Sequence, residues 1–101
     1  MRYEAFLLTF DTTQISRDAL LQGIDNIDEI ANWYAFLPAS VCLVSKLTAS
    51  DLSRLIKLRF RELRFLVVKL ERGQRQGWLP RSVWDFMKEA RPARKVDSAA
   101  E

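Results

Sequence analysis

The sequence predicts an α+β fold in which two helices pack on one antiparallel sheet. Four short segments are rich in aromatic and β-branched residues, as strands are, and two segments between them repeat apolar residues with the spacing of a helix face. Two strand segments are joined by the short Pro-containing stretch 37–40, which is typical of a hairpin. The 101 residues suffice for one domain with a two-layer core.

The first strand is expected within residues 2–11, where the apolar run Phe6–Phe10 ends at Asp11. Ser16 can cap a helix that we expect to run from about residue 17 to residue 27. One stripe of this helix carries the apolar residues Leu20, Ile24 and Ile27. Gly23 is a weak point in it, because glycine lowers helix stability.

Residues 29–46 carry the strongest strand pattern of the chain. The arms Ile30–Phe36 and Val41–Val44 are almost continuously apolar, which predicts burial on both faces. We expect helices to cover one face of this hairpin and a partner subunit to cover the other. The hairpin is therefore predicted to lie at the centre of the sheet.

The second half of the chain predicts another helix and another strand. Thr48 can cap the helix, and Phe65–Leu70 reads as a further central strand. The apolar stripe of the helix consists of Leu52, Leu55, Ile56 and Phe60. A glycine-bounded polar loop follows the strand, and Pro80 is well placed in the first turn of a last short helix.

This order of elements gives the ferredoxin-like split-βαβ arrangement, βαββαβ, plus a short C-terminal helix. We expect one domain over residues 1–90 and a disordered tail over 91–101, where only Val96 is a sizeable apolar residue. The sheet face away from the helices also needs cover. Trp33, Trp78 and Trp84 are candidates to supply it, through the last helix or a dimer interface, with Trp78 as a hydrophobic plug.

The absence of histidine removes several mechanisms, including a Ser-His-Asp triad, an imidazole base and histidine-bound zinc. Metal chemistry would depend on carboxylate oxygens, which suit Mg or Mn. The lone Cys42 lies in an apolar strand and is predicted to be a buried small hydrophobe. No apolar run approaches the roughly 20 residues that span a bilayer, so a cytoplasmic protein without a membrane partner is expected.

The charge of the chain is asymmetric. Residues 1–50 hold three Lys/Arg and six Asp/Glu, a net charge of −3, whereas residues 51–101 hold thirteen and seven, a net charge of +6. This excess could track the phosphates of a nucleic acid, or it could be the solvated face of an amphipathic helix. The candidate nucleic-acid-binding residues are Arg54, Lys57, Arg61, Arg72 and Arg75.

Several stretches together resemble a known family: Thr9–Asp11, Trp33–Leu37, Thr48–Leu52, Arg64–Leu70, and Gly77–Pro80 leading to Trp84. They resemble the small SinR-like proteins, whose fold is similar to that of the smaller subunit of the CRISPR spacer-integration complex. More distantly, residues 41–70 resemble GhoS-type antitoxin ribonucleases. The resemblance covers about residues 3–87, and its motifs are mostly packing residues.

In that wider superfamily, a carboxylate at the end of the first strand is associated with metal binding and phosphodiester cleavage across a two-fold axis. The resemblance implies this catalytic and metal-binding role for Asp11, with Mg or Mn shared between two subunits. The chain departs from the pattern because no second acid follows Asp11 closely. The alternative is that Asp11 caps the turn after the strand.

Three functions therefore stand as hypotheses. We favour a homodimeric, nucleic-acid-associated protein of the SinR-like type with little or no nuclease activity. The alternatives are a metal-dependent endonuclease, acting on DNA or RNA through Asp11, and a protein-interaction module such as an antitoxin-like partner in a toxin–antitoxin pair. The residues expected at an interface are Trp33, Tyr34, Trp78 and Trp84.

Overall fold

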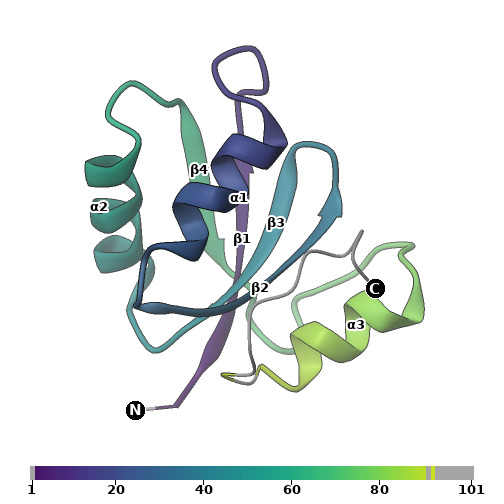
Figure 1. Cartoon of the computed structure of the whole chain (residues 1–101). Helices are drawn as coiled ribbons and strands as arrows, with labels where there is room; N and C mark the ends of the chain where they lie inside the picture. Colours follow the sequence, from purple (N-terminus) through teal and green to yellow (C-terminus); the bar gives the residue numbers. More distant parts are fainter. Residues whose placement is uncertain (1, 91, 93–101) are drawn as a thin grey trace.

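The computed structural model describes residues 2–90 and 92 and contains four strands and three helices (Figure 1). In chain order they are β1 (Glu4–Phe10), α1 (Arg17–Asp25), β2 (Ile30–Leu37), β3 (Ser40–Ser45), α2 (Ala49–Arg59), β4 (Phe65–Lys69) and α3 (Arg81–Lys88). The strands form one antiparallel sheet in the order β2-β3-β1-β4. The predicted ferredoxin-like α+β fold with an added C-terminal helix is confirmed.

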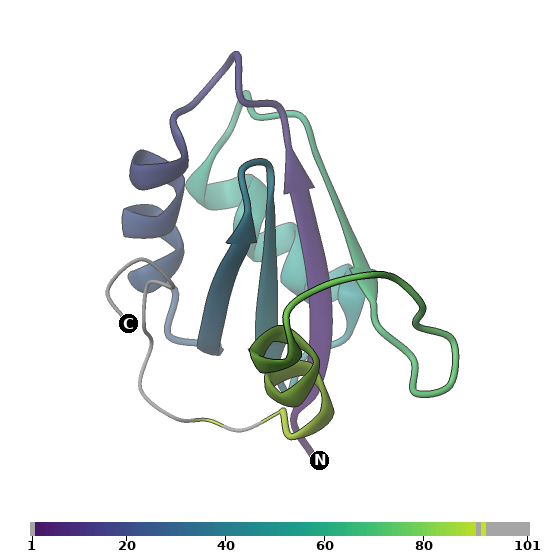
Figure 2. The same ribbon diagram turned by 90° about the vertical axis from the view of Figure 1, so that its right-hand side faces the viewer.

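The two faces of the sheet have separate apolar clusters, because successive side chains of a strand point to opposite faces. On one face, Phe6 and Leu43 pack with α1 and α2 in the larger cluster. On the other face, Ala5 and Cys42 pack with α3 in a smaller cluster. Figures 1 and 2 show α1 and α2 on one side of the sheet, and α3 with the loop before it on the other.

The sheet order corrects the predicted position of two strands. Only β3 of the predicted central hairpin is central, since β2 forms one edge of the sheet and β4 forms the other. On β4, Leu66 is 58% exposed and Val68 is 38% exposed, so this strand is covered on one face alone. Its apolar residues on both faces made it resemble a central strand. The second face of β3 is covered by α3 of the same chain rather than by a partner subunit.

The three tryptophans lie in three different environments. Trp33 is buried on the α1 and α2 side, where its indole Nε1 donates to Asp25 Oδ1 at 3.2 Å. Trp84 packs on the α3 side, as expected. Trp78 is 99% exposed, so it does not dock α3 onto its own domain, and the predicted contact with a partner stays a prediction. Leu79, the next residue, packs into the α3 cluster instead.

Local signals in the sequence place the helix starts correctly. Ser16 Oγ accepts the backbone N–H of Ala19, and Thr48 Oγ1 accepts that of Asp51, each at 3.1 Å. These caps satisfy amide groups that the first turn of a helix leaves without partners. Cys42 is buried, as predicted.

The structure describes too little of the C-terminal tail to test whether it is disordered. The tail predicted to be disordered, 91–101, lies almost wholly outside the described residues, with Pro92 alone described. Within 2–90, no helix combines the length and hydrophobicity that a bilayer crossing requires.

Gly23 weakens α1 through its low helix propensity, but its position also has no room for a side chain. The Phe60 ring lies directly over it, and a Cβ added to Gly23 would come within 2.7 Å of Phe60 Cε1 and closer still to Cζ. Phe60 is the C-cap of α2. The missing side chain therefore lets the end of α2 pack against α1.

We predict that Gly23→Ala lowers the free energy of unfolding by about 1 kcal/mol. Overpacking costs about 1–3 kcal/mol, which exceeds the gain of about 1 kcal/mol from better helix propensity. Urea denaturation measures the change. Gly77→Ala is the matched control, because its Cβ would meet Trp84 at an ordinary 3.7 Å. Equal or higher stability of Gly23→Ala would contradict this packing.

Candidate functional site

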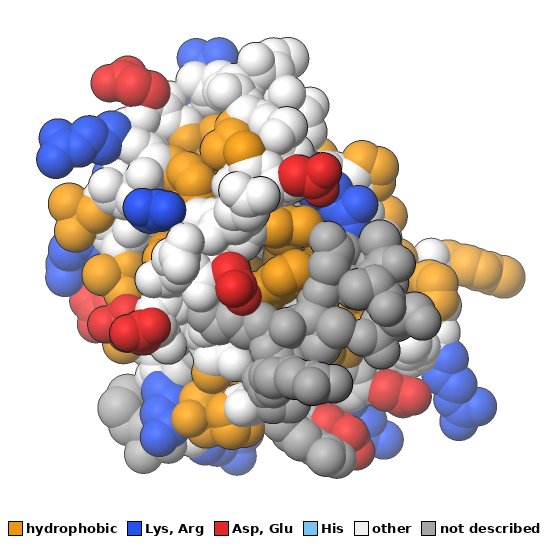
Figure 3. Space-filling model, viewed as in Figure 1, with side chains coloured by type: hydrophobic (Ala, Val, Ile, Leu, Met, Phe, Trp, Pro, Cys, Tyr) orange, Lys and Arg blue, Asp and Glu red, His pale blue; other side chains and the backbone are white. Residues whose placement is uncertain are grey.

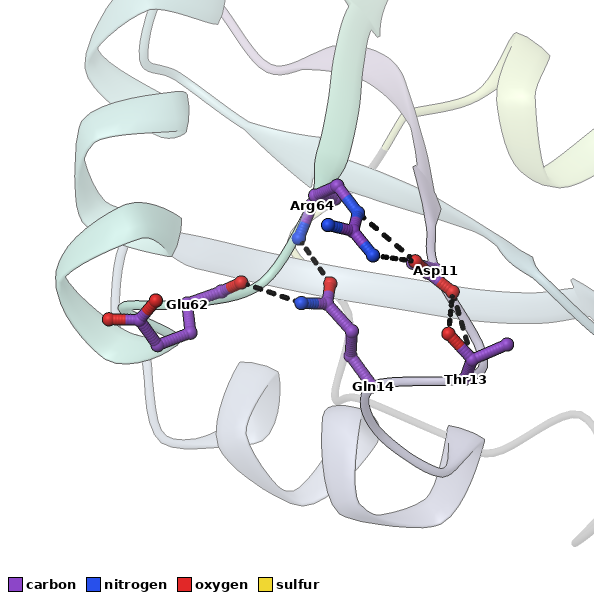
Figure 4. Close-up of polar contacts among 5 residues, drawn as sticks. All are labelled: Asp11, Thr13, Gln14, Glu62 and Arg64. Atoms are coloured by element: carbon purple, nitrogen blue, oxygen red, sulfur yellow. Dashed lines mark hydrogen bonds and ion pairs between the residues drawn. The ribbon is translucent and has the colours of Figure 1, made fainter.

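The loops that follow β1 and α2 meet at one end of the sheet. Figure 2 shows both loops at the top of that view, and Figure 4 shows the polar side chains that join them. Asp11 belongs to the first loop and Arg64 to the second, and the backbone N–H of Asp11 donates to the Arg64 carbonyl at 3.1 Å. The sheet pairing of β1 with β4 ends one residue earlier, at Phe10 and Phe65.

Both oxygens of the Asp11 carboxylate are engaged. Oδ1 accepts the Thr13 backbone N–H at 2.9 Å and the Thr13 hydroxyl at 2.6 Å. Oδ2 accepts Arg64 Nε at 3.2 Å and Nη2 at 3.0 Å. A carboxylate has about four acceptor positions, and all four are used here. Asp11 thus closes the turn after β1 and anchors the loop before β4.

Gln14 makes a second bridge between the same loops. Its Nε2 donates to the Glu62 carbonyl at 2.8 Å, and its Oε1 accepts the Arg64 backbone N–H at 2.6 Å (Figure 4). A side-chain amide can satisfy one donor and one acceptor of the backbone at once. Gln14 therefore gives the backbone of the loop before β4 one donor and one acceptor, as a neighbouring strand would.

These contacts lower the pKa of Asp11. The hydroxyl of Thr13 contributes most, followed by the Thr13 backbone N–H and the Arg64 guanidinium, and each favours the charged carboxylate. Asp11 and Arg64 form an ion pair at neutral pH, and the lowered pKa keeps the carboxylate charged to a lower pH than an ordinary aspartate. A group with a lowered pKa in the folded state adds stability above its ordinary pKa, and this stability is lost as the pH falls through the folded-state value.

Within one copy of the chain, the surroundings of Asp11 do not fit a divalent cation. A metal ion would have to displace Thr13 or Arg64 from the carboxylate, and the Arg64 charge opposes a cation at this point. Among the described residues, no group of three or more acids or cysteines could hold a metal ion. The geometry matches the alternative interpretation of Asp11 as a turn cap.

A hollow of about 370 Å³ opens beside this network. Its lining residues come from the two joined loops and are Gln14, Ile15, Phe60, Arg61, Glu62 and Leu63. Glu62 and Arg61 bring opposite charges to the rim. The hollow therefore has no net preference for an anion or a cation.

Three of the predicted nucleic-acid-binding residues share the outer face of α2. Arg54 and Lys57 are exposed on the helix, and Arg61 is exposed just after it. Figure 3 shows basic side chains along the left edge of the molecule, where α2 lies. Arg54 also pairs with Asp51 at 3.1 Å, but exposed pairs of this kind contribute little and leave the guanidinium accessible.

The other two predicted basic residues lie on the opposite face of the sheet. Arg72 Nη2 donates to the Lys88 carbonyl at the end of α3 at 3.0 Å. Arg75 lines a cavity between α3 and the sheet. One flat surface therefore cannot contain all five predicted residues. Three of them lie on the α2 side of the sheet and two on the α3 side.

The residues expected at an interface are also dispersed. Tyr34 is half-buried against α3, where its hydroxyl lies 3.0 Å from Ser82 Oγ and its ring meets Phe86 edge-on at 5.3 Å. Trp84 lies in the same cluster, whereas Trp33 is buried on the far side of the sheet. Trp78 is the member of this group that stands fully exposed.

Three residues of this network are not among the predicted site residues: Thr13 and Arg64, which bond the Asp11 carboxylate, and Gln14, which bridges the two loops. An Asp followed two residues later by Thr is a recognised turn pattern, so the Thr13 contact was accessible from the sequence. The contact with Arg64 joins residues 53 positions apart and depends on the pairing of β1 with β4. No local signal could have revealed it.

Comparisons with protein-family models, with curated proteins and with solved structures find no match to this chain. The geometry of the chain itself therefore carries the functional argument.

We predict that NMR titration of the Asp11 carboxyl carbon gives a pKa below the ordinary value of about 3.9. Thr13→Val is expected to raise this pKa, because it removes the hydroxyl that contributes most to lowering it. Thr12→Val is the matched control, since Thr12 is exposed and makes no described contact with Asp11. A pKa that Thr13→Val leaves unchanged would contradict the network drawn in Figure 4.

Proposed function

We propose that this protein is a homodimeric, non-catalytic nucleic-acid-binding protein of the SinR-like type, and that it acts in the cytoplasm. The observation that carries the proposal is the exposed basic face of α2, formed by Arg54, Lys57 and Arg61. Side chains spaced in this way along a helix can contact successive phosphates of one backbone. The exposed Leu58 on the same face adds apolar contact area.

The state of Asp11 favours binding without cleavage. Its carboxylate is fully engaged within one chain, and the adjacent Arg64 replaces the positive charge that a metal ion would supply. The endonuclease alternative requires the Asp11 residues of two subunits to release these contacts and share a metal. Breaking several charged hydrogen bonds opposes that rearrangement.

The outer face of β4 supports the homodimer. Leu66 and Val68 are exposed beside each other on β4, an edge strand of the sheet. Apolar residues exposed on a sheet edge are a common site of association. Contact between two copies there would leave α2, on the other face, open to a nucleic acid.

We predict that Lys57→Glu/Arg61→Glu weakens binding to labelled DNA or RNA at least tenfold, measured by gel shift with single- and double-stranded forms of both. Loss of two phosphate contacts should also reduce the slope of log affinity against log salt by about 2. The matched control is Arg81→Glu/Lys88→Glu, which makes the same charge change at two exposed positions of α3 and should bind as the wild type does. Absent or salt-insensitive binding by the wild type would contradict the proposal.

The same substrates incubated with magnesium or manganese test the absence of catalysis. We expect shifted bands without cleavage for the wild type and for Asp11→Asn alike. Metal-dependent cleavage by the wild type that disappears in Asp11→Asn would establish the endonuclease alternative instead. The absence of any shift in all variants would favour the protein-interaction alternative.

We predict that light scattering after gel filtration gives the mass of two chains at micromolar concentration. Leu66→Glu/Val68→Glu should give the mass of one chain, because buried like charges would face each other across the interface. Leu58→Glu is the control, since Leu58 is 62% exposed on α2, on the other side of the sheet. A wild-type monomer would exclude the dimer.

A further inference from the structure

A cavity of about 260 Å³ lies between α3 and the sheet face that α3 covers. Its walls come from the sheet, from the loop between β4 and α3, and from α3 itself. Most of the lining side chains are apolar, namely Leu7, Phe36, Leu37, Leu70, Leu79, Trp84 and Met87. A volume just below the roughly 300–1,000 Å³ of sites for drug-sized molecules limits an occupant to a small one.

Arg75 brings a single positive charge into these apolar walls. Its Nη1 atom is buried and has no hydrogen-bond partner among the described residues. The other polar lining residues are Ser40, Gln74 and Gln76, so no described lining residue is acidic. A buried guanidinium N–H without an acceptor is unfavourable by itself, which makes it a ready donor to an anion.

A buried thiol lies next to the sheet wall of the cavity. Cys42 is the cross-strand partner of the lining residue Leu7, and burial raises the pKa of its thiol to about 12. The Arg75 charge acts on that thiol in the opposite direction. The Nη1 atom of Arg75 is itself buried, and a charge-assisted hydrogen bond to a buried donor is stronger than one in water.

We propose that this cavity binds a small amphipathic monocarboxylate, whose carboxylate accepts from Arg75 and whose apolar body packs against Leu79, Trp84 and Met87. One guanidinium among apolar walls matches one negative charge. A phosphate monoester carries a charge of about −1.5 to −2, which a single guanidinium does not neutralise. Such binding is independent of the basic face of α2, because the two sites lie on opposite faces of the sheet.

The test titrates the full chain with sodium octanoate by calorimetry and by ¹H–¹⁵N NMR. We expect a dissociation constant below about 1 mM, with shifts at the residues that line the cavity. Acetate has the charge without the apolar body, and 1-octanol has the apolar body without the charge. Each should bind at least tenfold more weakly than octanoate. Equal binding of either probe would overturn the proposal.

Arg75→Met isolates the role of the charge while keeping an apolar stem. It should weaken octanoate binding at least tenfold and keep 1-octanol binding within twofold of the wild-type value. It should also raise the unfolding midpoint of the free protein, because it removes an unsatisfied buried N–H. Arg72→Met is the matched control on the same loop and should bind octanoate as the wild type does. Unchanged octanoate binding by Arg75→Met would refute the assignment, as would no octanoate binding by the wild type. Should Arg75→Met not fold, Leu79→Trp fills the cavity and is expected to abolish binding.

Discussion

The structure depends on the burial of β1 and β3 on both faces. Successive side chains of these central strands point to opposite faces and both sets are apolar, so each face needs a cover of its own. Helices α1 and α2 cover one face, with Phe6 and Leu43 between them and the sheet. The C-terminal helix α3 covers the other face over Ala5 and Cys42. A ferredoxin-like core without α3 would expose this second cluster.

The cover that α3 provides over the sheet is incomplete. Beside α3 it leaves a cavity with Arg75 on its wall, and beyond α3 it leaves Leu66 and Val68 of β4 exposed. The face of α2 that points away from the sheet is basic instead of apolar. One small sheet thus carries three chemically different surfaces: a cavity with one guanidinium, an exposed apolar strand face and a basic helix face.

Asp11 illustrates how a residue at a candidate catalytic position can serve the fold. Its carboxylate accepts from Thr13 within its own loop and from Arg64 across the sheet. The same two loops are bridged a second time by Gln14. Removing charge at Asp11 would therefore affect stability as well as any chemistry, so activity measurements on such variants need a parallel measurement of folding.

The sequence by itself determined the elements, because their signals are local: the helix caps at Ser16 and Thr48, the apolar periodicity of each segment, and the short turn at Pro38. It also determined that the outer face of α2 is basic. Only the tertiary structure decided which strands form the edges, that Arg64 pairs with Asp11, and that the basic residues divide between two faces. These features depend on contacts between residues far apart in the chain, and apolar content alone does not distinguish an edge strand with one open face from a central strand.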